Sequence, residues 1–309
     1  MPASSIPWGQ LTHIAHAFVL PSATGDLKSL AGYVDTELLT TAHAHGVKVV
    51  ASIGGAGASF AFASDPAGRA RMIASAVTLC KTYGYDGVDI DWEFPDASTG
   101  ASWASLIAEL RVALDGVDPK LTISAAVAAT DYNLKYLPTA SLASLDWIGV
   151  MTYDFAGEWS GTSGHDAPLY PTIGGDGGSV SQSVDYMVTT RGLPASKVLV
   201  GLPFYGHQFA GSSLGSSLVI PSSQVEYRDV VGMVGTSGWS RSWDATALVP
   251  FLSRPTSPGF LSYDDAPSIA DKCTYAKAKG VGGAIIWHLA ADRLGDGSNP
   301  LLTAAQGCR

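Results

Sequence analysis

Three carboxylates stand at alternate positions of the short apolar segment Asp86–Pro95, namely Asp89, Asp91 and Glu93. Residues two apart on a β-strand point to the same face, about 6.6 Å apart, so the three acids share one face of the strand. If this strand is buried, charge repulsion in a medium of low dielectric requires at least one acid to hold a proton. A protonated carboxylic acid beside carboxylates is suited to general acid–base catalysis.

Two other interpretations of this segment are an exposed edge strand and a site for Mg²⁺ or Ca²⁺. The apolar residues Val88 and Ile90, together with the helical stretch before them, favour a buried strand. The histidines do not strengthen the metal interpretation, because they lie on an early strand and at a polar helix end: His13, His16, His43 and His45. We therefore expect no metal and no cofactor.

The rest of the chain alternates between short apolar runs and amphipathic helical stretches. Strands are expected at His13–Leu20, Lys48–Ile53, Gly87–Glu93, Leu121–Val127, Trp147–Asp154, Lys197–Tyr205 and Gly283–Leu289. Helices are expected at, among other places, Gly68–Tyr83, Ala101–Leu114 and Ile269–Lys279. This alternation predicts βαβ units and a parallel sheet, and seven repetitions favour a TIM-type (β/α)8 barrel over an open sheet. Active sites of such barrels lie at the C-terminal strand ends, which is where Glu93 falls.

The stretch 207–262 interrupts this alternation. It is rich in Gly, Ser and Trp and contains short extended pieces such as Val225–Val231. The change of pattern predicts a small inserted α+β lobe before the last strand, so that the α/β barrel comprises 1–206 and 263–309.

The composition favours a neutral partner. The 309 residues carry a net charge of −9, which argues against nucleic acid and against an anionic membrane surface. With 46% hydrophobic residues the chain can bury a large core.

No apolar run approaches the roughly 18 residues of a membrane span, and the first residues lack the pattern of a signal peptide. Cys80 is expected in the core, whereas a pairing of Cys273 with Cys308 stays open.

The acidic segment, Asp-Gly-Val-Asp-Ile-Asp-Trp-Glu, resembles the D-x-x-D-x-D-x-E motif of family-18 glycoside hydrolases, the chitinases and their relatives. Further matches to the family follow in order, and the resemblance covers the chain from about His13 to Leu302. They are Ser52-Ile-Gly54-Gly55, Met151-Thr-Tyr153-Asp154, Gly201-Leu-Pro203-Phe-Tyr205-Gly206, Tyr263-Asp264-Asp265 and Trp287. Ser52, Gly54 and Gly55 are expected to shape a strand end without contacting substrate.

The resemblance implies a retaining mechanism in which the acetamide of the substrate takes the place of a protein nucleophile. Glu93 would protonate the glycosidic oxygen, and Asp91 would orient the acetamide. Asp89 would share a proton with Asp91, while Tyr153 would donate a hydrogen bond to the acetamido oxygen. The implied sugar-binding residues are Asp154, Trp287, Tyr205, Met151, Trp159, His207, Phe18 and Phe94.

Three of these assignments have alternatives. Met151 fits equally well as a core residue, and Trp159 fits as a side chain that packs inside the inserted lobe. His207 fits either as a titrating residue of the site or as an exposed loop histidine.

The sequence departs from the family most clearly at its start. No segment before Leu11 resembles the family's first strand, so we expect an incomplete barrel without a strand between the first and the last. Ala56 and Phe94 stand where many relatives have Trp and Tyr.

The resemblance implies an extracellular, monomeric chitinase that acts on chitin and N-acetylglucosamine oligomers. The alternatives are an endo-β-N-acetylglucosaminidase acting on glycoproteins and a chitin-binding lectin. The presence of Glu93, Asp91 and Tyr153 argues against the lectin.

Overall fold

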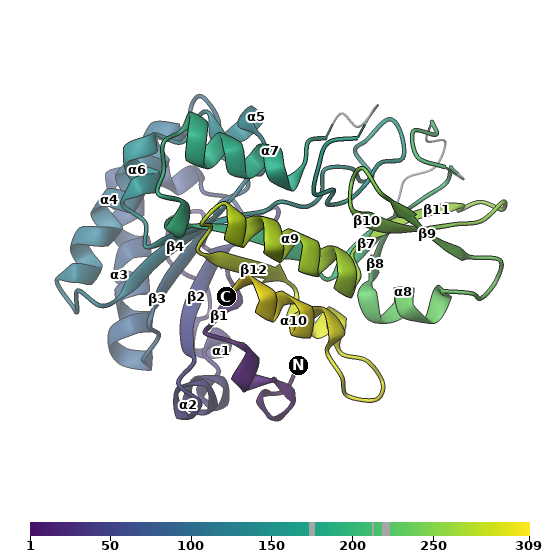
Figure 1. Ribbon diagram of the computed structural model, residues 1–309. Helices are drawn as coiled ribbons and strands as arrows, with labels where there is room; N and C mark the ends of the chain where they lie inside the picture. Colours follow the sequence, from purple (N-terminus) through teal and green to yellow (C-terminus); the bar gives the residue numbers. More distant parts are fainter. Residues whose placement is uncertain (173–176, 212, 218–222) are drawn as a thin grey trace. The chain divides into compact units, whose positions relative to one another are not determined.

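The computed structural model describes residues 1–172, 177–211, 213–217 and 223–309, and these form two compact units, Met1–Ile148 and Gly149–Arg309 (Figure 1). The first unit contains four parallel strands that pair in chain order: β1 His13–Val19, β2 Lys48–Gly54, β3 Gly87–Asp91 and β4 Thr122–Val127. Its helices are α1 Leu30–Tyr33, α2 Thr36–Ala44, α3 Pro66–Tyr83, α4 Gly100–Asp115, α5 Asp131–Leu134 and α6 Thr139–Ala143. Short 3₁₀ turns lie at Ala3–Ser5, Trp8–Gln10 and Ala61–Ser64.

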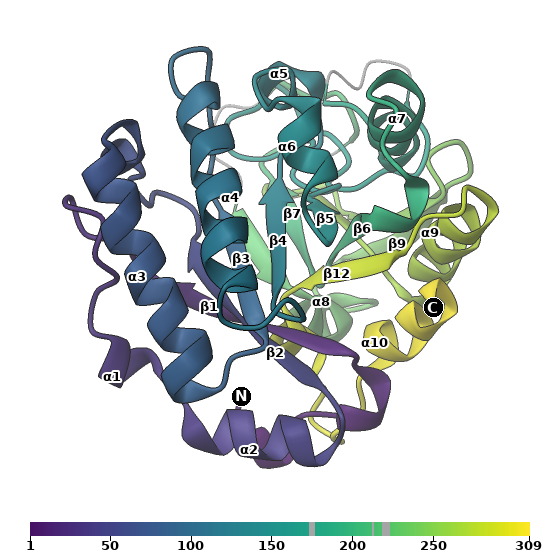
Figure 2. The same ribbon diagram turned by 90° about the vertical axis from the view of Figure 1, so that its left-hand side faces the viewer.

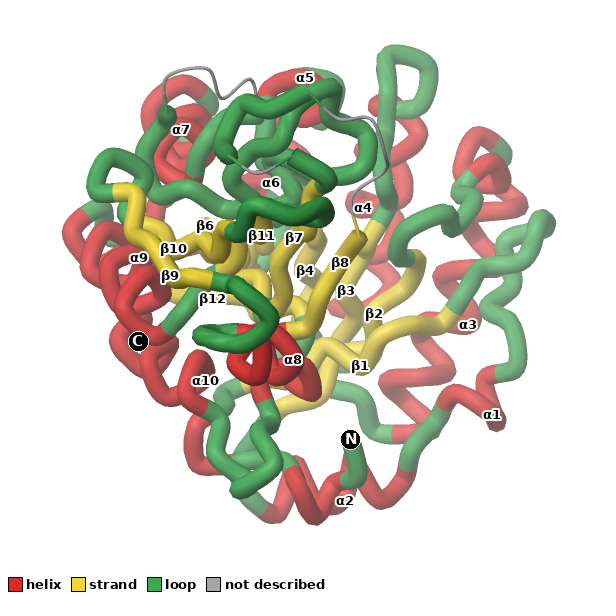
Figure 3. Tube along the Cα trace, turned by 90° about the vertical axis from the view of Figure 1, so that its right-hand side faces the viewer, coloured by secondary structure: helices red, strands yellow, loops and turns green. Residues whose placement is uncertain are grey.

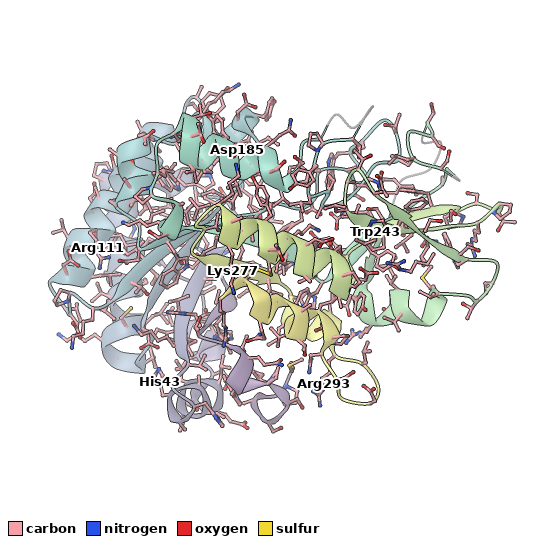
Figure 4. The ribbon with its side chains drawn as sticks, in the orientation of Figure 1. His43, Arg111, Asp185, Trp243, Lys277 and Arg293 are labelled. Carbon is pink, nitrogen blue, oxygen red and sulfur yellow. A yellow bond between two sulfur atoms is a disulfide. The ribbon has the colours of Figure 1, made fainter. Side chains whose placement is uncertain are left out.

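The two long helices of this unit, α3 and α4, lie side by side (Figure 2). The start of α3 follows from its sequence, because Asp65 accepts hydrogen bonds from two first-turn amides and Pro66 occupies a first-turn position where no N–H is needed. Gly84 ends α3 in the left-handed conformation that favours glycine. Arg111 of α4, labelled in Figure 4, donates a hydrogen bond to the Asp146 carboxylate and so ties this helix to the segment that follows α6.

The second unit contains two paired parallel strands, β6 Val198–Pro203 and β12 Gly283–Trp287. Its helices are α7 Val180–Asp185, which continues into a π-helical turn at Tyr186–Thr190, α8 Tyr227–Met233, α9 Ala266–Ala278 and α10 Pro300–Ala305. Short 3₁₀ turns lie at Ala195–Lys197, Leu289–Asp292 and Gln306–Cys308. In Figure 1, α9 and α10 lie next to each other, and a disulfide joins Cys273 of α9 to Cys308. The pairing left open by the sequence is thus present.

A five-stranded antiparallel sheet with the order β8-β7-β11-β10-β9 also belongs to the second unit. Its strands are β7 Tyr205–Phe209, β8 Ser223–Glu226, β9 Ser240–Asp244, β10 Val249–Ser253 and β11 Phe260–Tyr263. Helix α8 contacts β7 and β8 (Figure 3). Phe209 and Phe260 form the buried centre of this antiparallel sheet, with Phe251 packed against them. The antiparallel strands confirm the predicted insertion, whereas 207–262 as the bounds of a separate domain stays a prediction.

The parallel strands follow the order β1-β2-β3-β4-β5-β6-β12, where β5 is Trp147–Val150. All seven predicted strands are therefore present, and within the described ranges no eighth strand extends the order beyond β1 or β12. The expected incomplete set of barrel strands is confirmed. The residues before β1 form two 3₁₀ turns, and Trp8 of the second stacks on His45 with ring centroids 5.7 Å apart.

Four strands end two or more residues before their predicted ends, and one of them, β12, ends at Trp287 and not at Leu289. Strand β3 ends at Asp91 and not at Glu93, and β5 ends at Val150, before the tyrosine and aspartate of its motif. The run predicted as Lys197–Tyr205 divides, because β6 ends at Pro203 and Tyr205 begins antiparallel β7. Side chains beyond the last ladder hydrogen bond no longer alternate strictly between two faces. Among the described helices, none combines the length and apolar character that a membrane span requires.

Candidate active site

Asp89 lies at the centre of a row of three polar side chains that crosses neighbouring strands. Its register partners are Ser52 on β2 and Ser124 on β4. The Ser52 hydroxyl donates to one carboxylate oxygen at 2.8 Å, and the Ser124 hydroxyl donates to the other at 2.6 Å. Burial raises the pKa of Asp89, and the two serine hydrogen bonds oppose this shift. Sequence reasoning missed Ser124 and the contact of Ser52; the available signal was a single serine in each of these two apolar strands.

Asp91 ends β3 and is only 6% exposed. Burial, followed by the negative charges of Asp89 and Glu93, raises its pKa to about 8. At neutral pH the Asp91 carboxyl therefore holds a proton, and its Oδ1 atom is buried without a hydrogen-bond partner among the described residues. A Cβ atom at Gly54 would lie 2.0 Å from the Asp91 carbonyl oxygen, and Gly54 has a φ of 120°. Glycine at this position therefore lets β2 approach the end of β3 closely.

Glu93 lies two residues beyond the end of β3 and is half-buried. The sequence prediction placed it on the strand in one row with both aspartates; it is instead in the connection that follows, where side-chain direction is set by the loop. Phe94 is exposed, and Phe18 is half-buried, with its ring against Gly55. These positions are compatible with the predicted roles of both phenylalanines and do not test them.

In the second unit, Asp154 is the acceptor for two side chains of β7. The Tyr205 hydroxyl donates to its Oδ1 atom at 2.7 Å, and Nε2 of His207 lies 2.8 Å from the same oxygen. Residues 205 and 207 are two apart on one strand, so their side chains share a face and can reach one carboxylate. Tyr153 joins this group through an edge-to-face contact with Tyr205, at 6.0 Å between ring centroids.

The turn that carries Tyr153 is fixed by its neighbour Thr152. The Thr152 hydroxyl donates to the carbonyl of Gly201 at 2.8 Å and accepts from the Gly201 amide at 2.9 Å. A Cβ atom at Gly201 would come within 2.7 Å of the Tyr153 ring. Gly201, the first residue of the motif Gly201–Gly206, therefore leaves room for Tyr153 of the motif Met151–Asp154.

The structure decides two of the alternatives left open by the sequence. His207 is 6% exposed and lies on β7, so the exposed loop histidine is wrong. Trp159 is 59% exposed and stands edge-on to His207 at 5.7 Å, so it does not pack inside the lobe. Met151 is half-buried, and Trp287 ends β12 opposite Pro203. Contact of any of these residues with a sugar stays a prediction.

The charge of His207 follows from its surroundings. Burial lowers the pKa of this imidazole, but the hydrogen bond to Asp154 and the charges of Asp166, Asp154 and Glu158 outweigh burial, so the pKa is raised above its usual 6.5. His207 is therefore a cation at low pH and loses its charge as the pH rises through this raised pKa.

For His207→Arg we expect the alkaline limb of the kcat/KM profile to move to higher pH or to disappear, because arginine keeps its charge throughout the range. The check is the pH dependence of the chitin-oligomer cleavage that the sequence resemblance implies, measured for the variant and for the wild type. His43→Arg, at an exposed histidine beside Asp86, is the matched control and should leave the profile unchanged. An unaltered profile for His207→Arg would show that this histidine does not contribute to the limb.

One group in the described part of the chain has the geometry of a possible cation site. Asp154, Asp166 and His207 each offer a ligand atom, and these atoms lie within 4.8 Å of one another. We interpret the group as a hydrogen-bonded cluster, because Oδ1 of Asp154 already accepts from Tyr205 and bonds His207. The sequence pointed to Asp154 and His207 but missed Asp166.

Residues 2–292 match the family model for glycosyl hydrolases family 18. The chain therefore belongs to this family, and its fold class is the α/β barrel fold predicted from the sequence, with the antiparallel insertion. Chitinase A1 of Niallia circulans is 33% identical over 290 residues, which cover 80% of this chain and 41% of that protein. The chain thus spans less than half the length of this relative.

Two solved structures show how widely the family's properties vary on this fold. A family-18 N-acetylglucosaminidase from Paenibacillus barengoltzii is 28% identical, with a TM-score of 0.90 over 99% of this chain and 95% of that one. A chitinase-like agglutinin from Robinia pseudoacacia is 30% identical, with a TM-score of 0.84 over 100% and 96% of the two chains. Family membership alone therefore does not choose between an enzyme and a sugar-binding protein.

Proposed function

We propose that this chain is a chitinase that hydrolyses β-1,4 linkages between N-acetylglucosamine units with retention of configuration. The observation that carries the proposal is the graded set of acids at β3. Asp89 is buried and held by two serines, Asp91 is buried with a pKa of about 8, and Glu93 follows in the connection beyond. A substrate-assisted mechanism needs a buried carboxyl group that holds a proton, here Asp91, next to a more accessible carboxyl group, here Glu93.

In the proposed reaction, Glu93 donates a proton to the glycosidic oxygen as the bond to the anomeric carbon breaks. The acetamido carbonyl oxygen of the same sugar attacks that carbon from the opposite side and forms a cyclic oxazolinium ion. Asp91 accepts a hydrogen bond from the acetamide N–H, passing its own proton toward Asp89. Water then opens the ring while Glu93 takes the proton from this water, which restores the acid and gives the β-anomer.

Most of the proposed sugar-binding residues belong to the second unit. Tyr153 would donate to the acetamido oxygen, Asp154 would bind the distorted sugar, and Trp287 would lie beneath its apolar face. Tyr205 and His207 would act by holding the Asp154 carboxylate, and their hydrogen bonds to Oδ1 support this assignment. The exposed ring of Trp159 is suited to stack on the next sugar. Met151, Phe18 and Phe94 complete the proposed contact set.

Two other functions remain as competing outcomes. An endo-β-N-acetylglucosaminidase would share the acid segment, and a lectin would share the aromatic residues. The presence of Glu93 together with a buried, protonated Asp91 favours an enzyme over a lectin, because binding alone does not need a buried group that must hold a proton. An extracellular location and a monomeric state belong to the same proposal.

The experiment is to incubate the protein with a chitin hexamer, with an N-glycosylated protein and with no substrate, and to identify products by mass spectrometry. We expect shorter N-acetylglucosamine oligomers from the hexamer and no released glycan from the glycoprotein. Glycan release with an intact hexamer would identify the glycoprotein enzyme. Binding of the hexamer without any cleavage would identify the lectin.

A further inference from the structure

Asp166 is a buried acid that the proposed mechanism does not use. It is 1% exposed and belongs to the connection after Asp154, in the second unit. Its own amide donates to the hydroxyl of Ser262 on β11 at 2.9 Å, so its backbone is anchored to the antiparallel sheet. A buried carboxyl group costs free energy unless its hydrogen bonds compensate for the loss of water, which raises the question of what this one holds in place.

The contacts of Asp166 converge on the backbone of one turn. Its side-chain Oδ1 accepts a hydrogen bond from the amide of Asp154 at 2.8 Å. Its carbonyl oxygen accepts one from the amide of Phe155 at 3.0 Å. Two consecutive amides of the turn thus donate to the same residue, one to its side chain and one to its backbone.

This turn is conformationally demanding. Asp154 has a φ of 58°, in the left-handed region that residues other than glycine enter at a cost. The same residue directs its carboxylate to two side chains of β7, with Oδ1 bonded to both Tyr205 and His207. Asp154 is therefore held from two sides, by β7 at its carboxylate and by Asp166 at its backbone.

We propose that Asp166 is a positioning residue for Asp154, fixing the turn that presents the sugar-binding carboxylate. This inference rests on the function proposed above, in which Asp154 binds the distorted sugar. Asp166 itself is enclosed and contacts Asp154 through the backbone, so it acts through that residue and not on the substrate.

The hydrogen bond from the Asp154 amide requires an acceptor oxygen at this position, whatever the charge of the group that carries it. Burial raises the pKa of Asp166, the charge of His207, whose Nε2 lies 3.9 Å from Oδ1, opposes this shift, and the charge of Asp154 adds to it. The other charged group acting on it is Asp264. Asparagine has nearly the same shape as aspartate and keeps a side-chain oxygen that can accept this hydrogen bond. Asparagine should therefore replace Asp166 in this role.

The test uses Glu93→Gln protein, so that binding of a chitin hexamer is measured by titration calorimetry without turnover. Adding Asp166→Leu, which fills the buried space but removes the acceptor, is expected to weaken binding by about tenfold or more, as is Asp166→Ala. Adding Asp166→Asn, which keeps an acceptor oxygen, is expected to change the Kd by less than about threefold. Adding Asp154→Ala should weaken binding, and Asp166→Leu should then add little, because both act through the same contact.

The matched control is Asp244→Ala. Asp244 also pairs with a buried histidine, His165, and accepts two turn amides in the same unit, but it does not contact Asp154. Asp244→Ala should lower the melting temperature without changing the Kd of the hexamer. If the role of Asp166 were only structural, Asp166→Leu would behave in the same way. Wild-type binding by a folded Asp166→Leu or Asp166→Ala variant would overturn the inference, as would equal weakening by Asp166→Asn. Failure of the Glu93→Gln parent to bind any hexamer would instead contradict the proposed function.

Discussion

Replacing Glu93 with Gln is expected to lower the rate of chitin-oligomer hydrolysis by at least 10²–10⁴-fold, roughly the loss that follows removal of a general acid. Glutamine keeps the shape of the side chain but has no proton of suitable acidity to give to the departing oxygen. Glu93 is half-buried and lies outside the ladder of β3, so the substitution should leave the strand and its neighbours intact. The measurement is kcat and KM on a chitin hexamer, with circular dichroism and thermal unfolding to confirm the fold.

The matched control for this variant is Glu37→Gln, which makes the same chemical change at an exposed residue in the first turn of α2. It should retain wild-type activity. Binding of the hexamer to Glu93→Gln should persist, because the sugar contacts are assigned to other side chains. If Glu93→Gln kept more than about a tenth of the wild-type rate, its assignment as proton donor would be wrong, since general acid catalysis typically contributes far more.

The requirement for an acetamide should be equally strong. Fully deacetylated chitosan and cellulose are expected to remain uncut under conditions that degrade acetylated oligomers completely, because neither has the carbonyl oxygen that replaces a protein nucleophile. The first product from a chitin oligomer should be the β-anomer, since attack by the acetamide and then by water inverts the anomeric carbon twice. Proton NMR during the first minutes, before mutarotation, distinguishes the anomers.

Two controls make this second result interpretable. Partially acetylated chitosan should be cut only where the sugar that contributes the anomeric carbon to the cleaved bond is acetylated. Glu93→Gln protein should leave every polymer intact. Early appearance of the α-anomer would refute retention, and cleavage of the fully deacetylated polymer would refute assistance by the substrate.

The strands of the parallel sheet were predictable from the sequence because burial on both faces leaves an unbroken apolar run. The run that becomes β2, Lys48–Gly54, shows this clearly, and its predicted end was only one residue short. The end of β3 was not predictable in the same way. Alternation of acids continues to Glu93, but the ladder stops at Asp91, where the chain turns away for reasons that periodicity does not encode.

The site was predictable where short motifs carried it and unpredictable where it depends on distant contacts. Asp89, Asp91 and Glu93 stand in one segment, so a single pattern identified them. Asp166 holds the amide of Asp154 through a loop conformation, and nothing in the spacing of the two residues indicates that contact. The burial of His207 likewise depended on the antiparallel pairing of β7 with β8 and β11, which its local sequence does not indicate.

The disulfide between Cys273 and Cys308 closes a covalent ring over a sequence separation of 35, and this ring contains β12 and α10. In the chain-entropy model, closing a ring of this size lowers the conformational entropy of the unfolded chain and so stabilises the folded state by roughly 3–4 kcal/mol. Strand β12 pairs with β6 on one side and ends the strand order, a position from which a terminal strand would ordinarily fray. Here the strand cannot peel away as a loose tail, because both ends of its segment are tied to each other. If β12 detaches from β6, the disulfide still holds α9 to the turn at Cys308, so the released segment with Trp287 stays a closed loop and can return to the same place.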